Sequence, residues 1–196
     1  MVKDISKELQ ELLIQVGLKI AKRNDGAIFV VGKNVKHNPL VEQSVHSFKV
    51  ASNPKLLESL ALMDGAVIID EDGMLVAYGT MLKSTRVYHN FGTRHSAAIS
   101  ASKTAELVVM VSEEDKKVRI FKAGKMIMQL DPLEKNVEKS IPAAVQILES
   151  VGAGTIGAIG TTILAPTLGI ALLPGIVLFG SAYYVTKSIR KHFTKR

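Results

Sequence analysis

The sequence has no cysteine, and aromatic residues make up only 5% of its 196 residues. The lack of cysteine excludes disulfide bonds, thiolate zinc sites and cysteine nucleophiles, and it is consistent with a reducing compartment. The five histidines show no paired metal-ligand spacing such as HExxH, so a zinc hydrolase has no support. Walker A, G-x-S-x-G and GxGxxG motifs are also missing, so the usual nucleotide-binding folds have no support either.

Little net charge lies outside the C-terminus, although the net charge of the chain is +7. Five of these charges lie in the last ten residues, at Lys187, Arg190, Lys191, Lys195 and Arg196. The body of the chain is therefore nearly neutral, and we expect no nucleic-acid partner. The N-terminus contains acidic residues and no apolar stretch, so the sequence predicts no signal peptide.

Charged residues are absent from 150–186, a run of 37 residues that directly precedes the basic tail. A single straight helix of that length would measure roughly 55 Å, against about 30 Å for the hydrocarbon core of a bilayer. Pro166 lies near the middle of the run, so we expect a hairpin of two apolar helices in a membrane segment at 143–196. A re-entrant loop, one tilted span from about Thr167 and a soluble packing role are the alternatives.

The first 130 residues show the periodicities of a folded α/β domain. Apolar residues at steps of three and four predict a helix over 5–22, and Asn53-Pro54 predicts the start of a helix that ends near residue 62. Asp72-Gly73 between two apolar runs predicts a β-hairpin. A further helix is expected at about 93–102, and strands at 27–31, 66–70, 74–78, 107–111, 118–121 and 126–130.

The predicted fold class is therefore α/β, with a mixed central sheet flanked by helices and with apolar helices at the C-terminus. The stretch 81–92 is less regular than its neighbours. Residues 131–142 are polar and charged, which is typical of a linker. The predicted organisation is a domain at 1–130, a linker at 131–142 and the apolar segment at 143–196.

Three short stretches combine residue types that bind anions or cations, and each also has an ordinary structural explanation. Asp64-Gly65-Ala66 lies at a helix-to-strand junction, where a carboxylate can bind a metal or a hydroxyl, although Asp-Gly is also a common turn. Gly92-Thr93-Arg94-His95-Ser96 opens a predicted helix, whose N-terminus favours phosphate, or it is only a capped surface helix. Ser112-Glu113-Glu114-Asp115 offers the oxygen ligands that magnesium or manganese prefers, or it is an acidic turn.

Taken in order, these stretches resemble the diadenylate cyclase domain, also called the DisA N-terminal domain. Residues 27–32 resemble the opening GAxxV strand of the family, and Asp64-Gly65-Ala66 resembles its DGA motif. Gly92-Thr93-Arg94-His95 resembles its GTRH motif, and residues 111–114 resemble its VSEE segment. The resemblance covers roughly residues 20–130.

The resemblance implies a nucleotidyltransferase that joins two ATP molecules into cyclic di-AMP and releases two pyrophosphates. It implies a homodimer or higher oligomer with two sites face to face, and a divalent metal, Mn²⁺ or Mg²⁺, held by Asp64 and Glu114. The implied catalytic residues are Asp64, Arg94 and His95. The implied ATP-binding residues are Asp64, Gly65, Ala66, Gly92, Thr93, Arg94, His95, Ser96 and Ser112.

One residue departs from the family pattern, because the RHR triplet is here Arg94-His95-Ser96. Loss of one charge-assisted phosphate contact costs about 1.5–3 kcal/mol. Lys83 and Arg86 in the preceding stretch are candidates to compensate for the missing charge. The alternative is a membrane-bound sensor that binds ATP or cyclic di-AMP with weak or no turnover.

Use of ATP also bears on topology, because it implies a catalytic domain in the cytosol. The positive-inside rule places the Lys/Arg tail on the same side, so two crossings are expected. The predicted location is the cell membrane, with the catalytic domain on the cytoplasmic side and the apolar segment in contact with membrane lipid.

Overall fold

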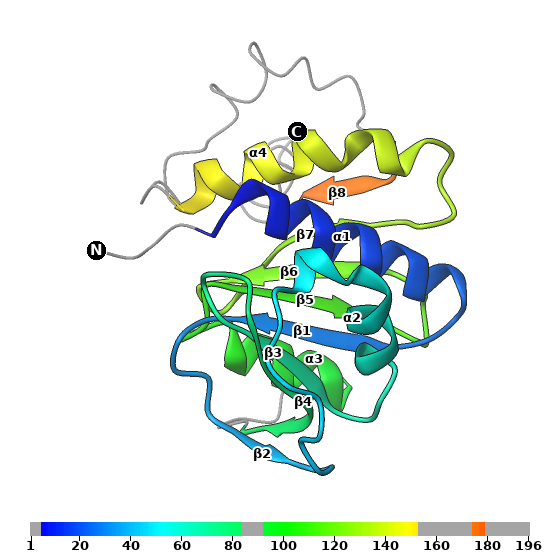
Figure 1. The fold of residues 1–196 in the computed structure, drawn as a ribbon. Coiled ribbons are helices and arrows are strands. Elements are labelled where there is room, and N and C mark those ends of the chain that lie inside the picture. The colour runs from blue at the N-terminus through cyan, green and yellow to red at the C-terminus, as the bar shows by residue number, and fades with distance from the viewer. Residues whose placement is uncertain (1–4, 84–91, 153–173, 179–196) are drawn as a thin grey trace, which may run out of the picture.

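The computed structural model describes residues 5–83, 92–152 and 174–178, which form one mixed sheet with helices on both faces (Figure 1). The strand order is β2-β4-β3-β1-β5-β6-β7-β8. β1 and β3 pair in parallel, and the other neighbouring strands pair antiparallel. The strands are β1 (Ala27–Val31), β2 (His37–Pro39), β3 (Ala66–Ile69), β4 (Leu75–Leu82), β5 (Leu107–Val111), β6 (Val118–Lys122), β7 (Lys125–Leu130) and β8 (Ile176–Leu178).

Local sequence explains where the helices begin. Ser6 caps α1 by accepting a hydrogen bond from the backbone N–H of Leu9, and Asn53 caps α2 in the same way at Leu56. The helices are α1 (Lys7–Lys22), α2 (Pro54–Ala61), α3 (Thr93–Ala101) and α4 (Ile141–Gly152), with short 3₁₀ turns η1 (Val50–Ser52) and η2 (Val137–Ser140). The predicted α/β class, the predicted helices of the first 130 residues and the predicted strands are confirmed.

The sheet is buried on both faces because α1, α2 and α4 cover one face and α3 covers the other. In β1, Phe29 and Val31 belong to the core under α1, whereas Ile28 and Val30 belong to the core under α3. All five residues of β1 are buried. This two-sided burial is the reason why β1 is apolar throughout instead of alternating.

Two strands were not predicted. β2 reads His37-Asn38-Pro39, which has no apolar alternation, and it forms the outer edge of the sheet beside β4. Proline is tolerated in an edge strand, where its missing N–H costs no ladder hydrogen bond. β8 pairs with β7 at the other edge. The expectation of helix is therefore wrong at Ile176–Leu178, because the free edge of β7 offers backbone partners there.

The described part of the predicted apolar segment packs on the α/β domain. Ala144, Val145 and Leu148 of α4 are buried in the core that α1 also lines, and Figure 1 shows α4 beside α1. The rest of the segment, at 153–173 and 179–196, lies outside the described residues, so the membrane segment, the basic tail and the domain boundaries stay predictions. A hairpin with an unbroken second helix does not, because β8 lies within that helix. In the ranges that the structure describes, no helix combines the length and apolarity needed to cross a bilayer.

Candidate functional site

The three stretches singled out in the sequence meet at one edge of the sheet. β3 runs parallel to β1 and β5 runs antiparallel to it, so the start of β3 and the end of β5 lie at the same edge. Asp64 precedes β3, Ser112 follows β5, and Gly92 precedes α3. They open onto one cavity of about 240 Å³, which is lined by Asp64, Gly92, Thr93, Arg94, His95, Met110, Ser112, Glu113 and Glu114.

A second cavity of about 330 Å³ adjoins the first, and Asp64, Thr93 and Arg94 line both. Its other walls are mostly apolar and come from β1, β3, β4, α3 and the residue after β2. They are Ile28, Leu40, Gly65, Ala66, Thr80, Met81, Leu82 and Ala97. Leu40, Met81 and Leu82 belong to no recognisable motif, so sequence analysis missed this cavity.

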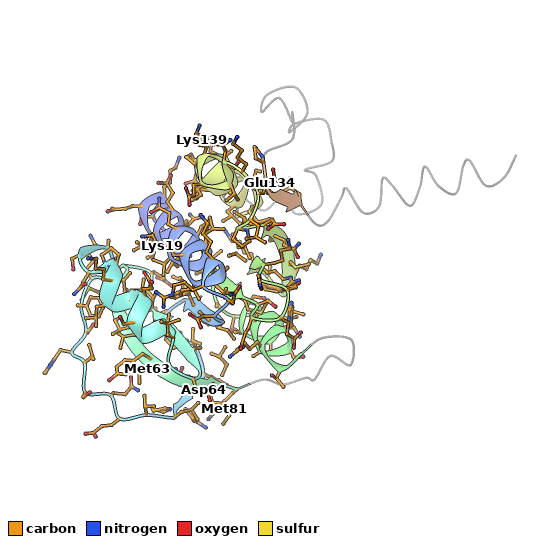
Figure 2. All side chains as sticks on the ribbon, turned by 90° about the vertical axis from the view of Figure 1, so that its right-hand side faces the viewer. Lys19, Met63, Asp64, Met81, Glu134 and Lys139 are labelled. Atoms are coloured by element: carbon orange, nitrogen blue, oxygen red, sulfur yellow. The ribbon has the colours of Figure 1, made fainter. Side chains whose placement is uncertain are left out.

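Exposed apolar side chains lie on one side of Asp64, which is itself exposed. Figure 2 shows Asp64 near Met63 and Met81 at the surface of the molecule. Met63 is 38% exposed, Met81 is 54% exposed and Leu40 is 49% exposed. Asp64 therefore lies beside exposed apolar side chains.

The N-terminus of α3 faces the first cavity. Gly92 is the N-cap residue, and among the described residues no side chain makes a capping hydrogen bond there. The backbone N–H of Ser96 bonds to the carbonyl oxygen of Gly92 at 3.1 Å, which closes the first turn. Uncapped N–H groups and the positive end of the helix dipole favour an anion at this position.

Arg94 is held at the mouth of both cavities by two neighbours. Its Nη1 donates to Oε2 of Glu113 at 2.8 Å. The guanidinium also lies over Gly26, where an added Cβ would stand only 2.7 Å from Nη1. The guanidinium of Arg94 can bind an anionic ligand here, but only in competition with the carboxylate of Glu113.

His95 is partly buried at the floor of the cavity. Burial lowers the pKa of its imidazole below the usual value, and the charge of Arg119 lowers it further, while Asp115 and Glu114 oppose the shift. The ring is therefore mostly neutral at pH 7 in the free protein. An incoming anion would reverse this balance, because it favours the imidazolium.

Ser112 interacts with the carboxylate of Asp115, which forms an ion pair with Arg119. Burial raises the pKa of Asp115, but hydrogen bonds from Arg119 and Ser112 outweigh it, so the net pKa is lowered. Nη1 of Arg119 donates to Oδ1 of Asp115 at 3.0 Å, and its Nη2 bonds to the second oxygen. Asp115 therefore serves to orient Ser112 and Arg119, a role that the acidic run in the sequence did not reveal.

Three predicted residues do not line the first cavity. Gly65 adopts φ +104, and a Cβ there would lie 2.6 Å from the backbone nitrogen of Thr80, so β4 itself requires a glycine. Ala66 is buried in β3 at the edge of the second cavity. Ser96 is only 4% exposed and lines neither cavity. An ATP contact by Ser96 stays a prediction.

The two residues proposed to replace the missing charge can be placed only in part. Lys83 is exposed and lines neither cavity, and Arg86 lies outside the described residues. Among the described residues that line the two cavities, Arg94 is the only permanent cation.

The carboxylates of Asp64 and Glu114 both line the first cavity. Within the described ranges, no group of three or more His, Asp or Glu residues could hold a metal ion by itself. Mg²⁺ is commonly bound by one or two carboxylates together with water and substrate phosphates, so the oxygen donors present fit such an ion only with a bound nucleotide.

Comparison with known proteins identifies the family of the chain. The family described as DisA bacterial checkpoint controller nucleotide-binding matches residues 17–126, more than half of the chain. A diadenylate cyclase of Haloferax volcanii is 31% identical over 144 residues, which cover 65% of this chain and 53% of the relative. A diadenylate cyclase of Methanocaldococcus jannaschii is 32% identical over 141 residues, which cover 64% of this chain and 45% of the relative.

The chain thus spans about half the length of these curated relatives. Among solved structures, DacA from Staphylococcus aureus is similar with a TM-score of 0.44 and 24% identity, over 61% of this chain and 84% of that one.

Proposed function

Because the chain belongs to the family described as DisA bacterial checkpoint controller nucleotide-binding, we propose that it is a diadenylate cyclase. It condenses two ATP molecules into cyclic di-AMP and releases two pyrophosphates. The observation that carries this proposal is the single edge of the sheet where Asp64, the N-terminus of α3 and Ser112 open onto one cavity. The relatives named diadenylate cyclase support it.

The two adjoining cavities support one orientation of the nucleotide. The triphosphate occupies the first cavity, against the N–H groups of α3, Arg94 and His95. The adenine occupies the second cavity, whose apolar walls suit a flat base. Asp64 lines both cavities, so the ribose between base and phosphates comes next to its carboxylate.

The reaction makes one new ester bond in each half. The 3′-oxygen of one ATP attacks the α-phosphorus of the other, and a new P–O bond forms. The bond between that α-phosphorus and the oxygen that bridges it to the β-phosphorus breaks. Pyrophosphate leaves with that electron pair, and the proton of the 3′-hydroxyl passes to the Asp64 carboxylate and then to water. Arg94 and the N-terminus of α3 stabilise the charge that develops on the phosphate oxygens. Repetition with the roles exchanged closes the ring.

The symmetric reaction requires two copies of the site. Each 3′-oxygen must reach the α-phosphorus of the other nucleotide, so we propose a homodimer or higher oligomer with the sites face to face. The exposed Leu40, Met63 and Met81 around Asp64 support this arrangement, because a second copy would cover their apolar surface. The gain in rate then comes largely from holding two reactants in line.

A divalent cation, Mn²⁺ or Mg²⁺, completes the proposed site. Asp64 and Glu114 would hold it together with phosphate oxygens of the nucleotide. When bound, it supplies charge neutralisation at the triphosphate.

We also propose attachment to the cell membrane, with the catalytic domain on the cytoplasmic side. The support is the uncharged run at 150–186 and the basic tail that follows it, which together suit lipid tails and anionic headgroups. Contact of the apolar residues of this run outside β8 with lipid would keep the cyclase close to the bilayer.

A second candidate is a sensor that binds ATP or cyclic di-AMP but turns over weakly or not at all. The observation that favours it is the single permanent cation, Arg94, among the described residues of the two cavities, with Ser96 buried behind them. Calorimetry separates the candidates, because a sensor binds nucleotide without forming product. In that case Ser96→Arg should restore part of the activity.

The direct test is a product assay with the purified full chain, ATP and Mn²⁺ or Mg²⁺. We expect cyclic di-AMP from the wild type and none from Asp64→Asn. Asp70→Asn is the matched control, because Oδ1 of Asp70 accepts the backbone N–H groups of Asp72 and Met74, each at 2.9 Å, in a turn outside the cavities. Asparagine can accept both bonds, so this variant should retain activity. Equal formation of cyclic di-AMP by the wild type and Asp64→Asn would refute the proposal.

A further inference from the structure

The side chain of Gln43 fastens the segment that follows β2 to β4. Its Nε2 donates to the carbonyl oxygen of Tyr78 at 2.8 Å, and its Oε1 accepts the backbone N–H of Tyr78 at 3.0 Å. Nε2 also donates to the carbonyl oxygen of Val41 at 3.0 Å. The amide of Gln43 thus satisfies both backbone groups of Tyr78, as a neighbouring strand would do.

The side chain of Tyr78 fastens the same segment a second time. Tyr78 is 2% exposed, and its hydroxyl donates to the carbonyl oxygen of Glu42 at 3.0 Å. The same oxygen accepts the backbone N–H of Val45 at 3.1 Å. Both ends of Tyr78, backbone and ring, therefore hold residues 42–45 against β4.

The segment that follows β2 also contains Leu40, which forms one wall of the apolar cavity. The backbone N–H of Leu40 bonds to the carbonyl oxygen of Gly79 at 2.8 Å, and the Leu40 side chain lines the cavity. Val41 packs directly on Gly79, where an added Cβ would meet its Cγ2 at 2.6 Å and where φ is +51. Leu40 is 49% exposed, so it has little packing of its own to keep it in place.

We propose that Gln43 is a positioning residue that fixes Leu40 as the outer wall of the adenine cavity. Gln43 lines neither cavity itself, so it acts on the base through the segment that it fastens. The phosphate cavity is built by α3 and the end of β5, which Gln43 does not contact through any hydrogen bond in the described ranges. The inference rests on the proposed function, because it requires a nucleobase in the apolar cavity.

Gln43→Met tests this role, because methionine keeps the length of the side chain and removes all three hydrogen bonds. Affinities of the full chain for ATP and for inorganic tripolyphosphate are measured by calorimetry in EDTA, so that no turnover occurs. We expect ATP to bind about tenfold more weakly, the scale of one well-placed apolar contact in a pocket. Tripolyphosphate, which has no base, should bind within about twofold of the wild type, since the phosphate cavity is untouched.

Two further variants complete the experiment. Tyr78→Phe keeps the buried ring and removes only the hydroxyl that holds residues 42–45, so it should weaken ATP in the same direction without affecting tripolyphosphate. Gln15→Met, at an exposed position of α1, is the matched control and should behave like the wild type.

The outcomes distinguish a failure of the positioning role of Gln43 from a failure of the proposed function. Wild-type affinity for ATP in both Gln43→Met and Tyr78→Phe overturns the positioning role and leaves the proposed function intact. Equal weakening of ATP and tripolyphosphate also overturns it, because Gln43 would then support the whole fold. A wild type that binds ATP no better than tripolyphosphate shows instead that no base enters the cavity, and the proposed function fails at that point.

Discussion

Replacing Glu113 by glutamine should strengthen the binding of a polyphosphate anion to the cavity. In the free protein the carboxylate of Glu113 forms an ion pair with the guanidinium of Arg94, with 2.8 Å between Oε2 and Nη1. A triphosphate must displace this carboxylate before it can form its own bonds with the guanidinium. Glutamine keeps the shape of the side chain but removes the charge that competes for Arg94.

The exposure of the two side chains sets the size of the effect. The side chain of Arg94 is 45% exposed and that of Glu113 is 58% exposed, so water screens the pair. Such surface pairs contribute about 0.2–1 kcal/mol, which corresponds to an increase in anion affinity of at most about fivefold. Arg94→Gln should act in the opposite direction and weaken binding by tenfold or more, since a charge-assisted contact is worth about 1.5–3 kcal/mol.

The assay is calorimetry with tripolyphosphate in EDTA, at low and at moderate salt. Glu138→Gln is the matched control, because it removes another exposed ion pair, that of Glu138 with Lys22 at 2.5 Å, on a different part of the surface. The gain for Glu113→Gln should shrink as salt rises. Weaker binding by Glu113→Gln would refute the reasoning, because Glu113 would then hold Arg94 in its binding position instead of competing for it.

Three other predictions concern the same edge of the sheet. Gly26→Ala should raise the KM for ATP several-fold with little change in Tm, because its Cβ displaces only the flexible end of Arg94; kinetics and a thermal melt check this. ATP binding should take up a proton and tighten as pH falls toward the lowered pKa of free His95, because burial lowers this pKa in the free protein and a bound phosphate raises it again. Calorimetry in buffers of different ionisation enthalpy measures the uptake, which His95→Asn should abolish. Gly65→Ala should cost about 2 kcal/mol or more in urea unfolding, because φ +104 and the backbone of Thr80 leave no room for a Cβ.

The elements that border the site could be predicted because each has a local signal. Asn53-Pro54 caps α2, and Asp72-Gly73 turns the hairpin between β3 and β4, as the residue types require. Two of the three motifs adjoin apolar strands, one before β3 and one after β5, and the third begins a helix, α3. The motifs of the phosphate cavity were therefore accessible from the sequence.

The apolar cavity could not be predicted, because it depends on long-range pairing. Leu40, Met81 and Leu82 come together only when β2 pairs with β4, and β2 has no strand-like pattern. Gln43 is likewise an ordinary polar residue until its amide meets the backbone of Tyr78, 35 positions later. Such contacts are set by register and by loop path, which single-residue propensities do not contain.

The structure adds a requirement at Gly65 that the sequence did not reveal. The resemblance implied that Gly65 binds ATP, and its positive φ and the approach of Thr80 show that the backbone of β4 also requires a glycine there. Ser96 shows a related limit, because its burial within α3 could not be inferred from its place in the motif.

The central claim is that this edge of the sheet joins two ATP molecules, and the ratio of products tests it most directly. Purified full-length chain, ATP and Mn²⁺ are incubated, and cyclic di-AMP, pyrophosphate, ADP and AMP are quantified together. The account predicts two pyrophosphates for each cyclic di-AMP, with no ADP, and loss of both products in Asp64→Asn. Pyrophosphate with AMP, or ATP that binds and stays intact at every protein and metal concentration, would contradict it.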